Sequence, residues 1–432
     1  MSAKAKVLFI AHGHPDYSLG GGEWAAVYMY RSMRPSDRYE PYLLAAVDDP
    51  VGAHAGRRLF RYEGDDHVQL YVTKKSGMDD FYHVGGDLSE IGDYLRRLRP
   101  DVIHLHHYMF FGVDLLSYAK YLLPDVKIVL TLHEFFAMCP NDGSMVKTNG
   151  VQLCYKSSAA DCYRCFPEDH VPGDFLVREQ LFKFNFDHVD HFIASSHFQR
   201  QRYLTWGVDP ERISVMDNGR PVPPRPHRSH PGNSRAFVVG YFGQILWHKG
   251  VDTLLQAAAE YQQLRKRQGA TALPELRFSV HGTMKCMAPH EAKVINDHLA
   301  NTREVAQYHG AYDREHMALL LAKVDCVAVP SRWWENAPLV INEAFMAGLP
   351  VVCSNIGGMA EKVADHVSGL HFLAGDPIDL LDKLLELAGA PELYDRLVAG
   401  IPPLLTQEQM AQRMHDLYDG LRSSLVPAAS LP

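Results

Sequence analysis

The sequence predicts an α/β protein made of two doubly wound domains, and three observations support this prediction. Short apolar runs without alternation recur along the chain, as expected of parallel strands that are buried on both faces of a sheet. Helical patterns lie between several of these runs, which is the order of βαβ units. At 432 residues the chain also exceeds what one hydrophobic core usually supports, so two domains of roughly 200 residues each are expected.

The first domain is predicted to cover residues 1–218. Its apolar runs predict strands at Val7–Ala11, Tyr42–Val47, Val102–Leu105, Ile128–Leu132 and His191–Ala194. One apolar helix face between them is formed by Leu88, Ile91, Leu95 and Leu98. The proline-rich residues 219–235 carry no periodicity and are predicted to be a linker.

The second domain is predicted at residues 236–404. A helix is expected at Val251–Arg267, and strands are expected at Ala236–Gly243, Leu276–His281, Val324–Pro330, Leu349–Ser354 and Gly369–Phe372. A last helix follows in residues 405–432. Thr406 and Gln409 have the spacing of a capping box, and an apolar stripe then falls on Met410, Met414, Leu417 and Leu421.

The composition excludes some classes of protein. The chain has 43 Lys and Arg against 51 Asp and Glu, and a net charge of −8 argues against broad electrostatic binding of nucleic acid. An apolar fraction of 47% and a charged fraction of 22% are ordinary for a folded protein. The sequence has neither an apolar run of about 18 residues nor the pattern of a secretory leader, so a cytoplasmic protein is expected.

Two acidic residues, Glu335 and Glu343, stand eight positions apart in the stretch PSRWWENAPLVINEAFMAGLP, residues 330–350. The stretch follows a predicted buried strand, and ligands bind at the carboxyl ends of strands in open α/β sheets. Asn336 is expected to cap a helix whose first turn includes Pro338. Free N–H groups there would bind an anion and the carboxylates would accept hydrogen bonds from hydroxyl groups, which suits a sugar attached to a nucleotide. A plain surface helix start would account for one glutamate.

Taken whole, this stretch resembles the Glu-x7-Glu signature of the retaining GT-B glycosyltransferases of family 4. The resemblance implies the GT-B fold, in which two Rossmann-like domains face each other across a cleft. It implies transfer of a sugar from a nucleotide diphosphate sugar, UDP- or GDP-linked, to a saccharide, a lipid-linked saccharide or a small-molecule acceptor, as in polysaccharide or glycoconjugate synthesis. The acceptor would bind to the first domain, and the final helix would cross back onto it.

The same resemblance assigns roles to individual residues. Catalytic roles are implied for His133, which would position the donor sugar, for Lys249, which would hold the pyrophosphate, and for Glu335. The glycine-rich loop would be residues 20–22. Donor binding is implied for Gly21, Gly22, Gln244, Gly282, Ala311, Asn336, Ala337, Leu339, Val340 and Glu343. The family more often has arginine in place of Gln244, and no metal is required for the implied chemistry.

Four cysteines, Cys139, Cys154, Cys162 and Cys165, lie in one predicted insertion at 139–165, and the last two form C-x-x-C. In a cytoplasmic protein this pattern favours a structural zinc ion over disulfides, with scattered free thiols as the alternative. Three histidines in DVIHLHHY, namely His104, His106 and His107, end another strand, and a structural role is favoured for them over a metal site.

Two other functions stay open at this point. A sugar-nucleotide 2-epimerase would have the same two-domain architecture but would turn over without an acceptor. A nucleotide-sugar-binding protein without catalysis would bind the donor and release nothing. A lipid-linked acceptor would also require peripheral contact with the inner face of the membrane.

Overall fold

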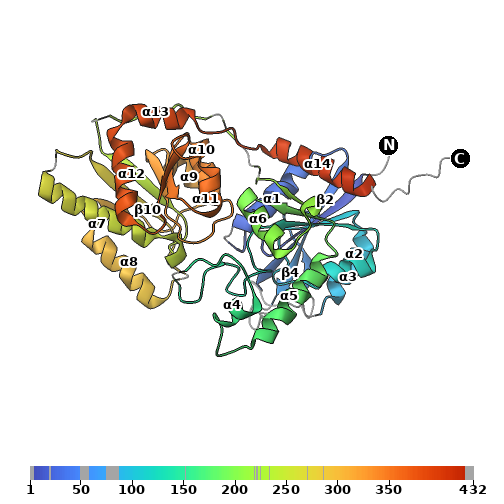
Figure 1. Cartoon of the computed structure of the whole chain (residues 1–432). Coiled ribbons are helices and arrows are strands. Elements are labelled where there is room, and N and C mark those ends of the chain that lie inside the picture. Colours follow the sequence, from blue (N-terminus) through green and yellow to red (C-terminus); the bar gives the residue numbers. More distant parts are fainter. Residues whose placement is uncertain are drawn as a thin grey trace. The chain divides into compact units, whose positions relative to one another are not determined.

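The computed structural model describes residues 4–18, 21–48, 58–73, 87–150, 152–217, 219, 222–223, 225–232, 234–269, 271–285 and 287–423. Gly20 of the predicted glycine-rich loop lies outside the described residues. The chain divides into two compact units, drawn in Figure 1: Met1–Pro221 together with Leu405–Pro432, and Val222–Leu404. Residues 222–235 of the predicted linker therefore belong to the second unit.

The strands of the first unit are β1 (Ala5–Ala11), β2 (Tyr39–Asp48), β3 (Leu59–Arg61), β4 (Val68–Thr73), β5 (Val102–Leu105), β6 (Lys127–Leu132), β7 (His191–Ala194) and β8 (Ile213–Val215). In the described part of the unit they form one sheet in the order β3-β4-β2-β1-β5-β6-β7-β8. β3 pairs antiparallel with β4, and the other neighbours are parallel. The predicted strands of this half are confirmed, whereas β3, β4 and β8 were not predicted.

The helices of the first unit are α1 (Gly21–Met33), α2 (Ser89–Leu98), α3 (Leu115–Leu122), α4 (Ala159–Tyr163), α5 (Pro172–Phe186), α6 (His197–Trp206) and α14 (Gln407–Ser423). A 3-10 turn, η1, covers Pro210–Arg212. The last helix begins with the predicted capping box, because Thr406 and Gln409 exchange hydrogen bonds between side chain and backbone at 3.1 and 3.2 Å. Its apolar side packs with α1, β1 and β2 in one core, and Figure 1 shows α14 beside α1.

The second unit contains β9 (Phe237–Phe242), β10 (Leu276–His281), β11 (Ala306–Tyr308), β12 (Cys326–Val329), β13 (Val351–Ser354) and β14 (Gly369–Phe372). Its described strands form a parallel sheet in the order β11-β10-β9-β12-β13-β14. The helices are α7 (Val251–Gln268), α8 (Pro289–Asn301), α9 (Met317–Leu321), α10 (Leu339–Met346), α11 (Gly357–Lys362), α12 (Pro377–Gly389) and α13 (Pro391–Ala399), with 3-10 turns η2 (Trp247–Lys249) and η3 (Arg314–His316).

Helices cover both faces of this second sheet. One core joins the sheet to α7, α8, α12 and α13, and another joins it to α9, α10 and α11. The unit is therefore doubly wound, as the buried apolar runs predicted.

The start of α10 corrects one prediction. The helix begins at Leu339 with Pro338 in the N-cap position, so Asn336 lies before the helix and does not cap it. The physical reason is proline, which disfavours helical backbone in the preceding residue, here Ala337. Pro338 itself has an extended ψ of 122°.

The strand order reverses direction once in each sheet. In the first unit the reversal lies between β1 and β5, and in the second it lies between β9 and β12. Loops after the carboxyl ends of strands at such a reversal diverge and leave a crevice where ligands bind. The residues that follow these four strands are therefore the first candidates for a functional site.

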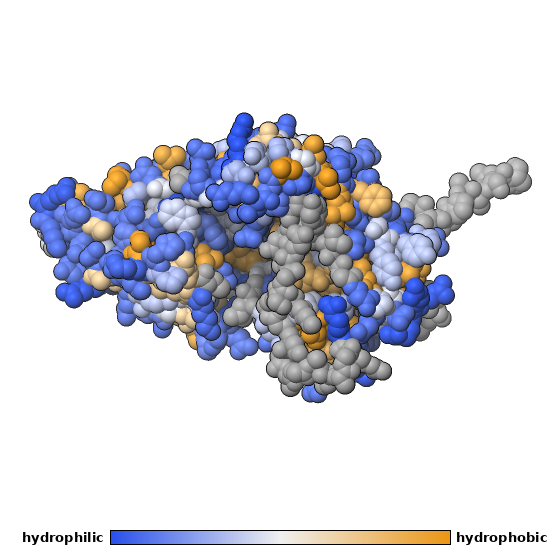
Figure 2. All heavy atoms as spheres, turned by 90° about the horizontal axis from the view of Figure 1, so that it is seen from below, coloured by the Kyte–Doolittle hydropathy of each residue, from blue (hydrophilic) through white to orange (hydrophobic). Residues whose placement is uncertain are grey.

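Hydrophilic residues predominate on the face of the molecule shown in Figure 2, with hydrophobic residues in separate patches. Among the described residues, no helix combines the length and the apolar character needed to span a bilayer.

Candidate active site

In the second unit, the loops after β9 and β12 place Lys249, Glu335 and Ser331 together. The Lys249 Nζ lies 2.7 Å from Glu335 Oε1, and the Ser331 hydroxyl donates a hydrogen bond to the same oxygen at 2.8 Å. The loops approach closely because Gly250 has a φ of 70° and packs on the Pro330 carbonyl, where a Cβ would overlap the oxygen. Only glycine fits that position without strain.

The protonation state of Glu335 follows from these contacts. Burial by itself raises the pKa of the carboxyl, but the Lys249 charge and the hydrogen bonds from Lys249 and Ser331 outweigh burial and lower the pKa below its usual value. Glu335 is therefore a buried carboxylate anion at neutral pH. It can accept hydrogen bonds from hydroxyl groups of a ligand but cannot act as a proton donor there.

Aromatic and basic side chains surround this pair. The Trp333 ring lies 5.0 Å from the Lys249 ammonium and 4.4 Å from the His248 ring. Burial and the Lys249 charge lower the pKa of His248 to about 4, so this histidine is neutral. Arg332 is held elsewhere, because it pairs with Asp252 at 2.8 Å.

The second glutamate of the stretch is in a different ion pair. Glu343 Oε1 lies 2.6 Å from the Arg314 guanidinium, which comes from the turn after β11. Burial and the Glu343 charge raise the pKa of the neighbouring Tyr312 to about 12. Both glutamates thus lie on the loop and helix that follow β12, but each is neutralised by its own cation.

The other predicted donor-binding residues occupy the ends of neighbouring strands. Gln244 follows β9 with an exposed side chain, and its carbonyl accepts a hydrogen bond from the Tyr241 hydroxyl at 2.8 Å. Gly282 follows β10 and donates its N–H to the Gly310 carbonyl at 2.8 Å. Ala311, which follows β11, is exposed.

Around the start of α10, the predicted residues divide into two groups. Leu339 and Val340 form the first turn of the helix, whose N–H groups have no partner within a helix. Asn336 and Ala337 belong to the loop before it. The Glu335 carbonyl accepts the Gly358 N–H at 2.6 Å, which ties this loop to the start of α11.

In the first unit, polar side chains gather after β1, β5 and β6. His12 Nε2 lies 3.6 Å from Glu23 Oε1, and Ser18 donates to that oxygen at 3.0 Å. Gly22, at the start of α1 beside Gly21, faces both His12 and His133. A Cβ on Gly22 would lie 2.9 Å from His12 Cε1 and 3.8 Å from His133 Cδ2.

His133 is paired with a second histidine. Its Nε2 lies 3.0 Å from Nδ1 of His106, and the two rings stack with centroids 5.2 Å apart. Burial and neighbouring histidines lower the pKa of His133 to about 3 and hold the pKa of His106 well below its usual value. Neutral imidazoles each have one donor and one acceptor nitrogen, so this pair is suited to orienting hydroxyl groups rather than to carrying charge.

The other histidines of DVIHLHHY have separate contacts. His107 Nε2 lies 3.2 Å from Glu134 Oε1, and the His107 ring is 4.8 Å from that of His12. His104 is fully buried between the Tyr418 hydroxyl at 2.6 Å and the Thr131 hydroxyl at 2.7 Å, which is a structural role. Within the described ranges, no group of three or more His, Cys, Asp or Glu side chains is arranged to hold a metal ion.

Sequence reasoning missed Glu23, Glu134 and Arg314. Glu23 follows the glycine-rich loop directly, and Glu134 is adjacent to His133, so proximity to a predicted site residue was an available signal. Arg314 pairs with a residue 29 positions away and carries no local signal.

Two protein-family profiles match the sequence. The family profile described as Glycosyltransferase Family 4 matches residues 19–222, and the profile described as Glycosyl transferases group 1 matches residues 225–401. Together they cover most of both units.

Individual relatives are more distant. A D-inositol 3-phosphate glycosyltransferase from Nocardioides sp. is 25% identical over 75% of this chain and 68% of its own length. The protein of the same name from Frankia alni is 29% identical over 55% of this chain and 60% of its own length. The crystal structure of Anabaena HepE in complex with UDP and glucose matches 96% of this chain and all of its own chain, with a TM-score of 0.65 and 17% identity.

Proposed function

The chain belongs to the GT-B glycosyltransferases of family 4, and from that premise we propose that it transfers a sugar, with retention of anomeric configuration, from a UDP- or GDP-linked donor to a saccharide, lipid-linked saccharide or small-molecule acceptor. The observation that supports this most directly is the Lys249–Glu335 ion pair with Ser331, at the reversal of strand order in the second unit. It offers a cation for a diphosphate and a carboxylate for sugar hydroxyls at one place. The Anabaena structure, which holds UDP and glucose in the same fold, is in line with a nucleotide-sugar donor.

In the proposed reaction, the acceptor hydroxyl attacks the anomeric carbon from the face that the nucleoside diphosphate leaves. The transition state resembles an oxocarbenium ion, with negative charge growing on the departing diphosphate. Catalysis then depends on stabilising that charge and on placing the acceptor close to the anomeric carbon. The diphosphate takes the proton of the acceptor hydroxyl as the glycosidic bond forms.

Lys249 is proposed to stabilise the diphosphate, together with the N–H groups of Leu339 and Val340 in the first turn of α10. Glu335 is proposed to accept hydrogen bonds from the donor sugar, and Glu343 from the ribose. The lowered pKa of Glu335 suits this role, because a carboxylate that stays ionised accepts hydrogen bonds throughout the neutral pH range. Gln244, Gly282 and Ala311 would contact the nucleotide mainly through their backbone.

The first unit is proposed to bind the acceptor. His133, kept neutral and held by His106, would orient a hydroxyl group of the donor sugar without acting as an obligate base. Gly22 would leave room for the ligand beside this pair, and Gly21 is its neighbour at the start of α1. A lipid-linked acceptor would bring the protein into peripheral contact with a membrane, and retention in a membrane pellet at low but not high salt would test this.

The test is incubation of the purified chain with UDP- and GDP-linked sugars, with and without candidate acceptors. The proposal predicts release of nucleoside diphosphate that increases with acceptor, and an NMR spectrum of the product that shows the anomeric configuration of the donor. A product of inverted configuration would contradict retention. Turnover that is independent of acceptor would instead identify a 2-epimerase, and binding without turnover would identify a binding protein.

A further inference from the structure

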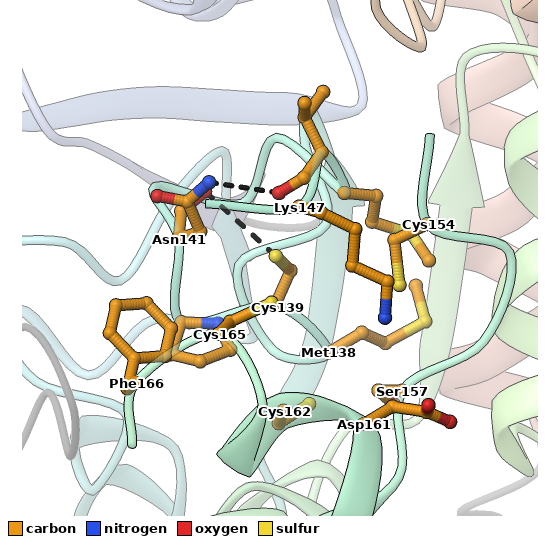
Figure 3. A pocket seen from close by; sticks show the side chains of 13 residues that line it. Met138, Cys139, Asn141, Lys147, Cys154, Ser157, Asp161, Cys162, Cys165 and Phe166 are labelled. Atoms are coloured by element: carbon orange, nitrogen blue, oxygen red, sulfur yellow. Dashed lines mark hydrogen bonds between the residues drawn. The ribbon is translucent and has the colours of Figure 1, made fainter. Parts of the chain in front are cut away.

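The segment between β6 and α5 encloses a small cavity that is separate from the residues assigned above. Its volume is about 20 Å³, enough for roughly one small bound species. Figure 3 shows that the cavity is lined from several directions by Cys139, Cys154, Cys162 and Cys165. The proposed reaction assigns no role to any of these four cysteines.

Three different local structures bring these cysteines to the cavity. Cys139 ends a turn after β6, where its N–H donates to the Phe135 carbonyl at 2.8 Å. Cys154 follows the antiparallel bridge between Val146 and Leu153, and its N–H donates to the Met145 carbonyl at 2.7 Å. The fold of this segment therefore brings together cysteines that are not neighbours in the sequence.

The last two cysteines share one turn of chain. Cys162 lies in α4, and the Cys165 N–H donates to the Cys162 carbonyl at 2.9 Å. This turn brings both side chains of the C-x-x-C sequence to the wall of the cavity, as Figure 3 shows. Structural zinc sites commonly have this layout, in which two ligands come from one such turn and two come from separate segments.

Two of the thiols contact backbone carbonyl oxygens. The Cys139 sulfur lies 3.8 Å from the Asn141 carbonyl oxygen, and the Cys154 sulfur lies 3.4 Å from the Lys156 carbonyl oxygen. All four cysteines are free of disulfides. The four sulfur atoms are not yet arranged as the ligands of one metal ion, which agrees with the lack of a preformed metal-binding group among the described residues.

We propose that Cys139, Cys154, Cys162 and Cys165 bind one structural zinc ion, in a C-x14-C-x7-C-x2-C site. Binding replaces the two sulfur–carbonyl contacts, and the thiols give up their protons to solvent as they become zinc ligands. Four thiolates around Zn²⁺ carry a net charge of −2, and Lys147, which also lines the cavity, provides a nearby positive charge. The ion would cross-link a segment whose regular structure is limited to α4 and one isolated bridge.

This proposal is independent of glycosyl transfer and is tested on the full chain without an activity assay. Protein produced with zinc in the medium should contain about one zinc ion per chain by elemental analysis, and X-ray absorption at the zinc edge should show sulfur ligands at about 2.3 Å. Cys162→Ser and Cys165→Ser should each lower the zinc content several-fold. Cys353→Ala, which removes a buried thiol from the second unit, is the matched control and should leave it unchanged.

Two results on the unmodified chain would overturn the proposal, so it does not depend on whether the variants fold. One is protein that was produced with zinc in the medium but contains no metal, and whose four thiols react freely with a thiol reagent. The other is mass spectrometry that finds these cysteines joined in disulfides. Zinc that is present but bound by nitrogen and oxygen alone would contradict it equally.

Discussion

Lys249 and Glu335 are separated by 86 positions in the sequence, yet the ammonium of one lies 2.7 Å from the carboxylate of the other. The lysine follows β9 and the glutamate follows β12, which are neighbours in the sheet where the strand order reverses. The pair keeps a positive charge in place before any ligand binds. Because the two residues contact each other, the effect of substituting one of them on activity should depend on whether the other is present.

Replacing Lys249 by methionine should lower kcat/KM for transfer by about 100-fold or more, the usual loss when one preorganised stabilising group is removed from a transition state. The variant should also be less stable, because Glu335 becomes a buried carboxylate without its cation. Steady-state kinetics and thermal unfolding measure the two effects.

The double variant Lys249→Met with Glu335→Gln separates these effects. It should regain much of the stability and none of the activity, since the uncompensated charge is gone but the diphosphate still lacks its lysine. Lys266→Met, at an exposed position in α7, is the control. Near-normal transfer by the double variant would refute the assigned roles.

Replacing Glu343 by alanine should raise KM for the donor by about tenfold, with a smaller change in kcat, because a hydrogen bond to a charged group contributes roughly 1.5 to 3 kcal/mol. Arg314→Gln should have the same effect to a lesser degree, because it removes the 2.6 Å ion pair that holds the Glu343 carboxylate in place. Titration of nucleoside diphosphate by calorimetry measures the affinity directly, and Glu386→Ala on α12 serves as the control. Unchanged affinity in both site variants would remove Glu343 from the donor site.

Gly22→Ala should reduce transfer sharply, because the added methyl group would press on His12 and come within reach of His133. The matched control is Gly173→Ala in the first turn of α5, where a Cβ meets nothing within 4 Å. In a helix that control should be neutral or stabilising by up to about 1 kcal/mol. Equal activities of the two variants would show that the space beside Gly22 is not used.

The stability of the first unit should fall as the pH is lowered from neutral toward about pH 5. Burial lowers the pKa of His104 from 6.5 to about 3 in the folded chain, so below 6.5 the unfolded chain binds a proton that the folded chain does not. This histidine's contribution is complete above pH 6.5 and is lost as the pH falls toward 3. At pH 5 His104 by itself should account for a loss of about 2 kcal/mol. His133 and His106, whose pKa values burial also lowers, should add to this loss.

The stability of the first unit can be measured separately from that of the second by hydrogen exchange of peptides from β1 and β5 at neutral and acidic pH. His104→Gln should be less stable at neutral pH but should depend less on pH, whereas His227→Gln, at an exposed position, should keep the original dependence. An unaltered pH dependence in His104→Gln would show that another group is responsible.

Transfer should survive brief treatment with EDTA, because the proposed stabilisation of the diphosphate comes from Lys249 and helix N–H groups rather than from a divalent cation. The rate is measured before treatment, after it, and after addition of Mg²⁺ or Mn²⁺, with zinc content followed in the same samples. An inactive enzyme that Mg²⁺ or Mn²⁺ restores would contradict this mechanism.

Much of the fold could be predicted because the buried strands are continuous apolar runs such as Val7–Ala11 and Leu276–His281. The capping box at Thr406 and Gln409 is a local contact within four residues, and it was predicted correctly. β3 has three residues and is too short to show a period, whereas Val68, Leu70 and Val72 do alternate in β4, so that strand carried an available signal. The start of α10 differs from the prediction because Pro338 disfavours helical backbone at Ala337.

Less of the candidate site could be predicted, because its contacts join segments that are far apart in the sequence. The strand order that brings Ser331 to Lys249, and the turn that brings Arg314 to Glu343, are properties of the folded sheet. No spacing in the sequence encodes them. The sequence therefore singled out Lys249, Glu335 and Glu343, but it could not give the ion pairs that these residues make.

The return of α14 to the first unit has a consequence for biosynthesis. Tyr418 reaches His104 from the far end of the chain, and Met410, Met414 and Tyr418 fill the core beside β1 and β2. During translation those strands leave the ribosome long before the helix that covers them, whereas residues 222–404 emerge as one uninterrupted stretch. The first unit is thus completed only after residues 222–404 have been synthesised, and a nascent chain must keep an apolar surface from aggregating until α14 has emerged.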